Sequence, residues 1–442
     1  AIDYTVCSAA LRKTAASRGA DALRLSHRRG TKWNHIQRNR RITASESNST
    51  MTPSGQKICL SMIVKNEAPV IRRCLDSVRA IIDHWVIVDT GSTDGTQDII
   101  RAALADVPGT LLERPWVDFG HNRTEALELA RPHGDYTLVI DADDELIAAH
   151  GGTALPVNYK MPDLDAPGYT LQIHDTTMRY PRTQLFKNAL PWRYRGVLHE
   201  FAECEELVWT DTSLPLAMRR GHDGARRRDE STYARDAEIF EKALKIEKDP
   251  YLLSRYMYYL ANSYRDCGEK RKALQAYLNR TTMGFWEEEI YISYLGAALL
   301  MDNLDEPFDE VISCFDKAIA INPRRVEAVY YVSRYCQDKK RYVEAYHYAE
   351  SGLELSAPTD GLFVQHWMYN YGLRDKFSVI AFNTGQYRAC LSACISVLGC
   401  PEFPHEERQQ RVEIARKALA KMVDPAWGAN HSSYSAVYSP DW

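Results

Sequence analysis

Three carboxylates follow directly after an apolar run, and their spacing suits a divalent cation. The run covers residues 136–140 and leads into Asp141, Ala142, Asp143 and Asp144. A buried strand that ends in Asp-x-Asp can hold Mg²⁺ or Mn²⁺ through hard oxygen ligands, and the ion can then bridge two phosphates. A strand followed by an acidic turn fits the same residues, because Asp is common in turns. The segment alone leaves both interpretations open.

A second polar segment, residues 89–96, follows the apolar run 85–88. Asp89 closes that run and can accept hydrogen bonds from a nucleobase or a ribose. Ser92 and Asp94 are residue types that cap the start of a helix, and the two glycines of the segment permit tight turns. Capping alone would explain Ser92 and Asp94, but it does not explain why Asp89 closes an apolar strand.

Strand-like and helix-like patterns alternate around these segments. Strands are expected at 58–64, 85–88, 111–112 and 138–140, with helices after the first two. This alternation predicts an α/β domain with a Rossmann-like, mostly parallel sheet and helices on both faces. Ligands bind such sheets at the carboxyl ends of the strands. The polar clusters 65–67, 89–96 and 141–144 all follow predicted strands, so we expect them to converge on one crevice.

Composition narrows the class of protein. The 442 residues are 45% hydrophobic and 26% charged, as in an ordinary globular protein. No apolar run of about 18 residues occurs, so no membrane-spanning helix is expected. The ten cysteines form no CxxC pair and no zinc-ligand spacing. This usage indicates free thiols in a reducing compartment, and we therefore expect a cytoplasmic protein.

The first 56 residues form a basic extension that we expect to be disordered. Residues 1–50 carry a net charge of +7, against −11 for the remainder of the chain. The extension has no periodic apolar face. It could be a targeting peptide, a basic arm for nucleic acid, or a stretch upstream of a true start at Met51. We favour the last interpretation.

The second half of the chain has the pattern of helical repeats. Its first unit carries Ala261, Tyr264, Gly268, Ala273 and Tyr277, which are spaced as in a tetratricopeptide repeat. Stacked helix pairs of this kind form an all-α solenoid with a concave surface. We expect an α/β domain at 57–228, the repeat domain at 229–425 and an irregular tail at 426–442. The solenoid could bind an acceptor or form a homodimer.

The motifs of the first domain together resemble family 2 glycosyltransferases of GT-A fold. The resemblance is carried by residues 60–67, 88–96, 118–123 and 135–143, and further by 182–188 and 192–200. It is closest to a bacterial and phage branch that carries tetratricopeptide-like helices after the GT-A domain and lies near the protein S-glycosyltransferases.

The resemblance implies a site for a nucleotide sugar, with a UDP-hexose as the expected donor. The implied contact residues are Lys65, Asn66, Glu67, Asp89, Ser92, Asp94, Arg123, Asp141 and Ala142. Asp89 would hold the uracil or ribose, and Arg123 would face the nucleotide or its diphosphate. As an alternative, Arg123 would be a solvated helix residue that pairs with a nearby glutamate.

The resemblance also implies a metal, Mn²⁺ or Mg²⁺. Asp143 would be the direct ligand, Asp141 would be shared between ribose and metal, and His222 would be a further ligand. A lone histidine is often not a ligand, so that interpretation of His222 stays open. Asp144 is left unassigned beyond a cap.

The acceptor must lose a proton as it attacks the sugar, and a carboxylate or imidazole would take it. Glu200 and His199 are the candidates, and Glu200 is favoured. Both could instead be structural polar residues under a loop. The arginines 226–228 could form a lid over the diphosphate or a solvated linker.

These observations predict a metal-dependent, inverting glycosyltransferase whose acceptor is a peptide or protein held partly by the helical repeats. Two alternatives remain. One is an inactive nucleotide-binding scaffold. The other is an enzyme that acts on modified DNA through the basic arm, although the −11 charge of the remaining chain argues against extensive DNA contact.

Overall fold

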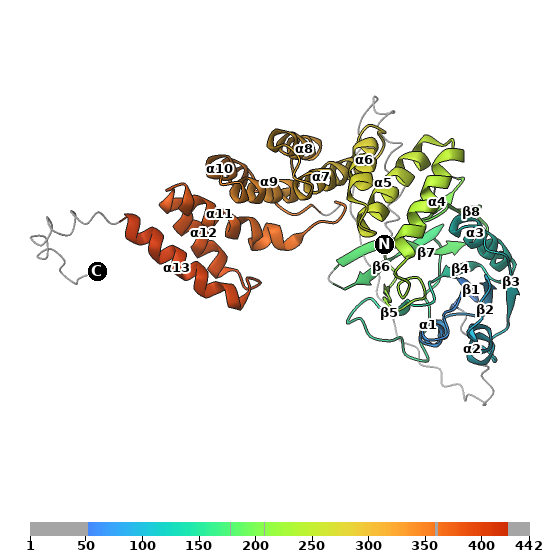
Figure 1. The fold of residues 1–442 in the computed structure, drawn as a ribbon. Helices are drawn as coiled ribbons and strands as arrows, with labels where there is room; N and C mark the ends of the chain where they lie inside the picture. The colour runs from blue at the N-terminus through green and yellow to red at the C-terminus, as the bar shows by residue number, and fades with distance from the viewer. Residues whose placement is uncertain (1–51, 177, 207, 359–360, 423–442) are drawn as a thin grey trace, which may run out of the picture. The chain divides into compact units, whose positions relative to one another are not determined.

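The computed structural model describes residues 52–176, 178–206, 208–358 and 361–422 (Figure 1). The chain divides into two compact units, the first ending at Ala243 and the second beginning at Leu244. The division falls within helix α4 (Thr232–Ile246), later than the boundary expected at residue 228. Nearly all of the expected basic extension and of the tail from residue 426 lies outside the described residues.

The N-terminal unit is built on an eight-stranded sheet with the strand order β3-β2-β1-β4-β7-β6-β10-β5. Its strands are β1 (Ile58–Val64), β2 (His84–Asp89), β3 (Gly109–Glu113), β4 (Tyr136–Val139), β5 (Glu145–Ala148), β6 (Gly168–Asp175), β7 (Met178–Lys187) and β10 (Leu216–Arg219). A separate two-stranded sheet pairs β8 (Trp192–Arg195) with β9 (Phe201–Cys204). The strands expected from the sequence correspond to β1 to β4.

Helices accompany the parallel half of the sheet. They are α1 (Ile71–Val78), α2 (Thr96–Ala103), α3 (Phe119–Ala130) and the short 3₁₀ helix η3 (Arg131–His133). Strand β1 has six of its seven residues buried, as expected for a central parallel strand. In α1 the buried residues are Ile71, Cys74, Leu75 and Val78, whose spacing places them on one face of the helix.

Strands β1 to β4 are parallel, and β1 pairs with both β2 and β4. The chain therefore reverses its direction of travel across the sheet between β1 and β4, and such a reversal is where open α/β sheets bind ligands. Beyond β4 the sheet is mixed, because β7 runs antiparallel to both β4 and β6. The strands of this mixed half have no counterpart among those expected from the sequence.

The C-terminal unit consists of helices that pack as successive pairs, α5 with α6, α7 with α8, α9 with α10, and α11 with α12. The helices are α5 (Pro250–Asp266), α6 (Lys270–Arg280), α7 (Glu287–Asn303), α8 (Phe308–Ile321), α9 (Val326–Asp338), α10 (Tyr342–Ser351), the π-helix η4 (Met368–Gly372), α11 (Leu373–Asn383), α12 (Tyr387–Gly399) and α13 (His405–Met422).

The repeat pattern seen in the sequence lies in the core of these pairs. Ala261 of α5 and both Ala273 and Tyr277 of α6 are fully buried, while Gly268 turns the chain between the two helices with φ +87°. Small side chains let the paired helices approach closely. An α/β domain followed by an all-α domain is the fold class expected from the sequence.

Two further properties concern the whole described chain. Among the described residues no helix has the length and apolarity needed to cross a membrane. Nine cysteines within that part of the chain are free thiols, and six of them are buried.

Candidate active site

The predicted polar clusters lie at one edge of the sheet, as expected. Residues 65–67 follow β1, residues 89–96 begin at the end of β2, and residues 141–144 follow β4. These strands are parallel, so their carboxyl ends meet at the same edge. The candidate site therefore spans the position between β1 and β4 where the strand order reverses.

The loops after β1 and β2 are joined by hydrogen bonds. The Asn66 N–H donates to Ser92 Oγ (2.9 Å), and the Thr93 N–H donates to Asn66 Oδ1 (2.8 Å). Asp94 Oδ2 accepts from the Ala68 N–H (3.0 Å). Asn66 has φ +57°, a left-handed conformation that Asn tolerates better than most residues. Asn66, Ser92 and Asp94 thus build the loop pair, while the N-cap position of α2 is occupied by Gly95.

Asp89 has one carboxylate oxygen without a partner. The side chain is fully buried, and its Oδ1 accepts hydrogen bonds from the N–H groups of Gly91 (2.8 Å) and Ser92 (2.7 Å). Its Oδ2 is also buried and has no hydrogen-bond partner among the described residues. A buried acceptor without a donor is costly and therefore rare. The Oδ2 atom is suited to accept a hydrogen bond from a ligand.

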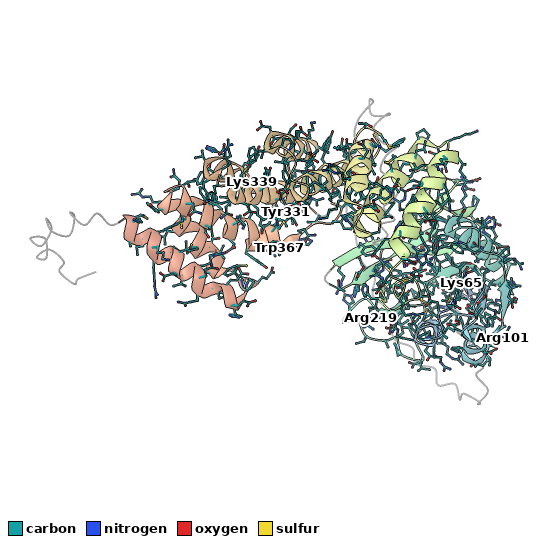
Figure 2. The ribbon with its side chains drawn as sticks, viewed as in Figure 1. Lys65, Arg101, Arg219, Tyr331, Lys339 and Trp367 are labelled. Carbon is teal, nitrogen blue, oxygen red and sulfur yellow. The ribbon has the colours of Figure 1, made fainter. Side chains whose placement is uncertain are left out.

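Lys65 and Ala142 differ in their exposure to solvent. Lys65 is exposed beyond the end of β1, and Figure 2 shows it on the N-terminal unit. Ala142 is buried between the acidic residues, with 6% of its surface exposed. Lys65 is therefore free to reach a ligand, while the Ala142 side chain belongs to the core.

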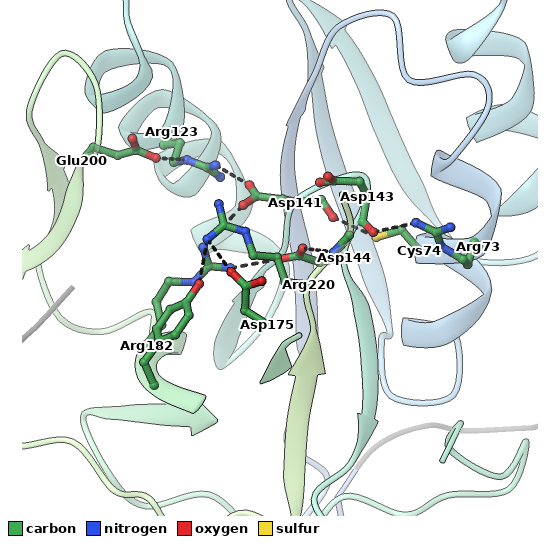
Figure 3. A network of polar contacts seen from close by, with 12 residues as sticks. Arg73, Cys74, Arg123, Asp141, Asp143, Asp144, Asp175, Arg182, Glu200 and Arg220 are labelled. Atoms are coloured by element: carbon green, nitrogen blue, oxygen red, sulfur yellow. Dashed lines mark hydrogen bonds and ion pairs between the residues drawn. The ribbon is translucent and has the colours of Figure 1, made fainter. Parts of the chain in front are cut away.

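Arg123 joins two residues predicted for different roles. Its guanidinium forms ion pairs with both Asp141 and Glu200, and only 11% of the side chain is exposed (Figure 3). Burial lowers the pKa of Arg123, but the two carboxylates outweigh it and hold that pKa well above its usual range. Arg123 is thus neither a solvated residue nor a free cation facing a diphosphate.

Asp141 is held by two arginines. Besides Arg123, the Arg182 Nη1 atom lies 3.5 Å from Asp141 Oδ2. Burial alone would raise the pKa of Asp141, but the two guanidinium charges lower it below its usual range. Asp141 is therefore a fixed carboxylate.

Asp144 has a structural environment. It is 2% exposed, and its two oxygens accept hydrogen bonds from Arg182 Nη2 (3.1 Å) and from the Gly221 N–H (3.1 Å). Burial and the nearby charge of Asp141 raise the pKa of Asp144. Asp144 connects the end of β4 to β7 and to the segment after β10, which is more than the cap expected from the sequence.

Asp143 is the acidic residue of the three that forms no ion pair among the described residues. Burial first, and then the charge of Asp141, raise the pKa of Asp143. Two glycines pack against it. A Cβ at Gly221 would lie 2.0 Å from the Asp143 carbonyl oxygen, and one at Gly224 would lie 2.8 Å from Asp143 Oδ2. The segment 221–224 therefore requires glycines where it covers Asp143.

The expected ligand set of Asp141, Asp143 and His222 is not assembled. The His222 Nε2 atom lies 3.0 Å from Asp175 Oδ1, and Asp175 also faces Arg220 at 3.5 Å (Figure 3). No group of three His, Cys, Asp or Glu side chains within the described ranges is arranged to hold a metal. His222 departs from the prediction because the buried Asp175 carboxylate of β6 attracts the imidazole.

The residues after β10 are attached to the loops of the site. Glu67 accepts hydrogen bonds from the Ala225 N–H (3.0 and 3.1 Å), and Arg228 donates to the Asn66 carbonyl (3.0 Å). Burial raises the pKa of Glu67 to about 7. Arg226 pairs with Asp236 at 2.8 Å. Two of the three arginines at 226–228 are thus attached to other parts of the unit, although Arg227 and Arg228 are exposed.

His199 and Glu200 lie side by side in a tight turn, but neither is open to solvent. They are 8% and 7% exposed. His199 has φ +52° and its ring stacks on Phe240 with centroids 6.1 Å apart. The cavity beside Glu200 measures about 20 Å³, which is room for roughly one water. Their role as a base stays a prediction that requires this turn to open.

Several charged residues of the site carried no motif in the sequence. They are Arg73, Asp175 and Arg220. Arg182 belongs to the segment 182–188 that carries the family resemblance, but the resemblance implies no role for it. A signal is present in part, because Arg182 lies in β7 just before the buried run 184–186. Its partner, however, is 38 residues away. The pairing of β7 with β4 decides that contact.

Several known proteins are similar to parts of this chain. The family model for glycosyl transferase family 2 matches residues 59–149. A TPR repeat-containing protein of Synechococcus elongatus is 32% identical over 45% of this chain and 51% of its own length. An uncharacterized glycosyltransferase of Rickettsia felis is 37% identical over 21% of this chain and 30% of its own. Glycosyltransferase SunS of Bacillus subtilis is 34% identical over 20% of each. The chain spans about half or less of the length of these relatives.

Proposed function

We propose, from the premise that residues 59–149 form a family 2 glycosyltransferase domain, that the protein moves a sugar from a nucleotide sugar to an acceptor. The donor we propose is a UDP-hexose, and the transfer inverts the anomeric centre. The observation that carries the proposal is the unpartnered Oδ2 of Asp89 at the carboxyl edge of the sheet. An acceptor-only oxygen is suited to the imino N–H of uracil or to a ribose hydroxyl.

The donor's phosphates belong on the other side of this site, over β1 and β4. Asp143 is the acidic residue there without an ion pair among the described residues, and it is half-buried. Mg²⁺ and Mn²⁺ sites of nucleotide enzymes commonly use one or two carboxylates together with substrate phosphates. Asp143 alone fits that requirement, so we propose it as the protein ligand. A bound cation would offset the charge that develops on the leaving diphosphate.

The chain's own residues would fix the geometry around that step. Arg123 and Arg182 hold Asp141 in one orientation, and its neighbour Asp143 follows two residues later on the same rigid strand end. Groups held this way need little reorganisation during reaction. The Lys65 side chain is exposed at the end of β1 and can supply a further positive charge.

Glu200 is proposed as the base that takes the acceptor's proton, with His199 as the second candidate. The Arg123 ion pair keeps the Glu200 carboxylate directed toward Asp141 (Figure 3). The turn that carries both residues contains two positive φ angles, at Gly196 and His199. Such strain often marks functional turns and gives this one a reason to change conformation when an acceptor binds.

The remaining partners are also proposals. We propose a peptide or protein acceptor held partly by the helical unit, since paired helices of this type bind peptides on their concave face. A homodimer through the same unit is the alternative use. The free cysteines of the described chain support a cytoplasmic location.

The test incubates the protein with a panel of nucleotide sugars and Mn²⁺, and measures slow hydrolysis without acceptor. The proposal expects release of UDP from one or two UDP-hexoses, and less from GDP- or ADP-sugars. If no nucleotide sugar is hydrolysed and no nucleotide raises the melting temperature, the domain is a scaffold rather than an enzyme. Hydrolysis of a purine nucleotide sugar alone would contradict the proposed donor.

A further inference from the structure

Trp116 presents an exposed aromatic ring just beyond the end of the edge strand β3. Its side chain is 41% exposed, although its ring meets Phe119 edge-to-face with centroids 4.7 Å apart. An indole ring that is open to solvent can stack on a nucleobase. We propose that Trp116 stacks on the nucleobase of the donor, an inference that rests on the proposed function.

The backbone around Trp116 is fixed. Asn122 is fully buried, and its side chain accepts a hydrogen bond from the Val117 N–H (2.9 Å) and donates to the Pro115 carbonyl (3.1 Å). One buried amide therefore holds the residues on both sides of Trp116. A ring held in this way loses little freedom when a ligand binds.

The same loop is attached to Asp89. Glu113 of β3 lies opposite Asp89 of β2, and the Arg114 N–H donates to the Asp89 carbonyl (2.9 Å). Trp116 follows two residues later. The loop that carries Trp116 therefore begins beside Asp89, whose side chain has the unpartnered oxygen.

The order of strands gives the site a direction. Along the edge, the loops of β3, β2, β1 and β4 succeed one another, and β3 is outermost (Figure 1). Neighbouring strands are about 4.8 Å apart, so β3 and β4 are separated by about 14 Å. That span is comparable to an extended nucleoside diphosphate. With the phosphates at Asp143 after β4, the base reaches the loops of β2 and β3.

Stacking and hydrogen bonding would then contribute differently to binding of the donor. Every nucleobase has a π-face, so stacking on Trp116 provides affinity with little selectivity. The Oδ2 atom of Asp89 provides the selectivity, because it can only accept a hydrogen bond. Loss of the Trp116 ring should therefore weaken the binding of all nucleoside diphosphates. The binding of ligands without a base should not change.

The experiment measures binding of UDP and of inorganic pyrophosphate, each with Mn²⁺, by calorimetry. Trp116→Ala is expected to weaken UDP at least about ten-fold, and Trp116→Phe less, because a base–aromatic stack is worth roughly a factor of ten or more. Pyrophosphate affinity should not change. The matched control is Trp209→Ala, since Trp209 is another exposed tryptophan of this unit, at 59%. Melting curves verify that each variant is folded.

A second readout is tryptophan fluorescence, which UDP should quench in the wild-type protein and in Trp209→Phe but much less in Trp116→Phe. Unchanged UDP affinity in Trp116→Ala would overturn the inference, whether or not transfer to an acceptor then slows. Equal losses of UDP and pyrophosphate would also overturn it, because they indicate a structural role. If the wild-type protein binds no nucleoside diphosphate, the proposed function fails first and this inference with it.

Discussion

Replacing Arg123 by methionine tests whether its ion pairs organise the site. The substitution removes the guanidinium between Asp141 and Glu200 while keeping most of the apolar stem. Glu200 bears most of the cost, because its side chain is 6% exposed. Asp141 is 32% exposed and keeps Arg182 at 3.5 Å. Breaking a buried ion pair by removing one partner costs about 3–5 kcal/mol, and the remaining Arg182 contact places the expected loss near the lower limit.

The assay is thermal unfolding followed by circular dichroism at pH 7.5 and pH 5. A loss of about 3 kcal/mol lowers the melting temperature by about 6–12 °C in a unit of roughly this size. The pH dependence follows from Asp141. In the wild-type protein its pKa lies below the usual range, so its contribution to stability is present above the unfolded pKa of about 3.9 and is lost only in stronger acid.

In the Arg123→Met variant, burial acts on Asp141 with less opposition, so its folded pKa rises. Protonation then relieves part of the penalty, and the difference from the wild-type protein should narrow as the pH falls toward 5. Adding Glu200→Gln to the variant should recover part of the loss, because the buried charge that has lost its contact with Arg123 is removed. A melting temperature equal to the wild type, or a difference that does not change with pH, would refute the reasoning.

Two further predictions concern the segment 221–224, which packs against Asp143, and Glu67, which accepts hydrogen bonds from the adjacent Ala225 N–H. Burial raises the folded pKa of Glu67 to about 7, so the native state binds a proton that the unfolded chain has released. The stability of the fold therefore falls as the pH rises toward 7. Melting curves between pH 5.5 and 8.5 should show a smaller decline of the melting temperature for Glu67→Gln than for the wild type. Gly221→Ala should displace the segment from Asp143, because its Cβ would lie 2.0 Å from the Asp143 carbonyl oxygen, and should lower stability by about 1–3 kcal/mol in denaturant titrations. Its control is Gly399→Ala, where a Cβ has open space and no loss is expected; equal losses in the two variants would count against the packing argument.

The parallel half of the fold could be predicted because its signals are local. Strand β2 is apolar and ends in Asp89, and the residues that turn the chain and begin α2 follow within seven positions. Strand β4 is likewise buried throughout, and Asp141 follows two residues after its last residue, Val139. Local patterns also identified the helical pairs, since small and aromatic residues recur at fixed offsets.

The mixed half depends on contacts between distant residues. One of the two partners of Arg123 is Glu200, 77 residues later. Arg182 reaches back to Asp144 only because β7 pairs with β4. The sequence leaves the metal role of His222 open. Its actual neighbour, Asp175, belongs to β6, and no linear spacing indicates that β6 and β10 lie side by side. The role proposed for Trp116 likewise depends on the position of β3 at the edge of the sheet, which no local pattern indicates.

The central claim is that Asp143 binds a cation that holds the donor's diphosphate. The most direct test measures UDP affinity by calorimetry in Mn²⁺ and in EDTA, for the wild-type protein, for Asp143→Asn and for the control Asp98→Asn, whose side chain is 87% exposed on α2. The account predicts that Mn²⁺ tightens UDP binding in the wild type and in the control, and has no such effect in Asp143→Asn, which still melts as a folded protein. An Asp143→Asn variant that keeps the full Mn²⁺ effect would contradict it.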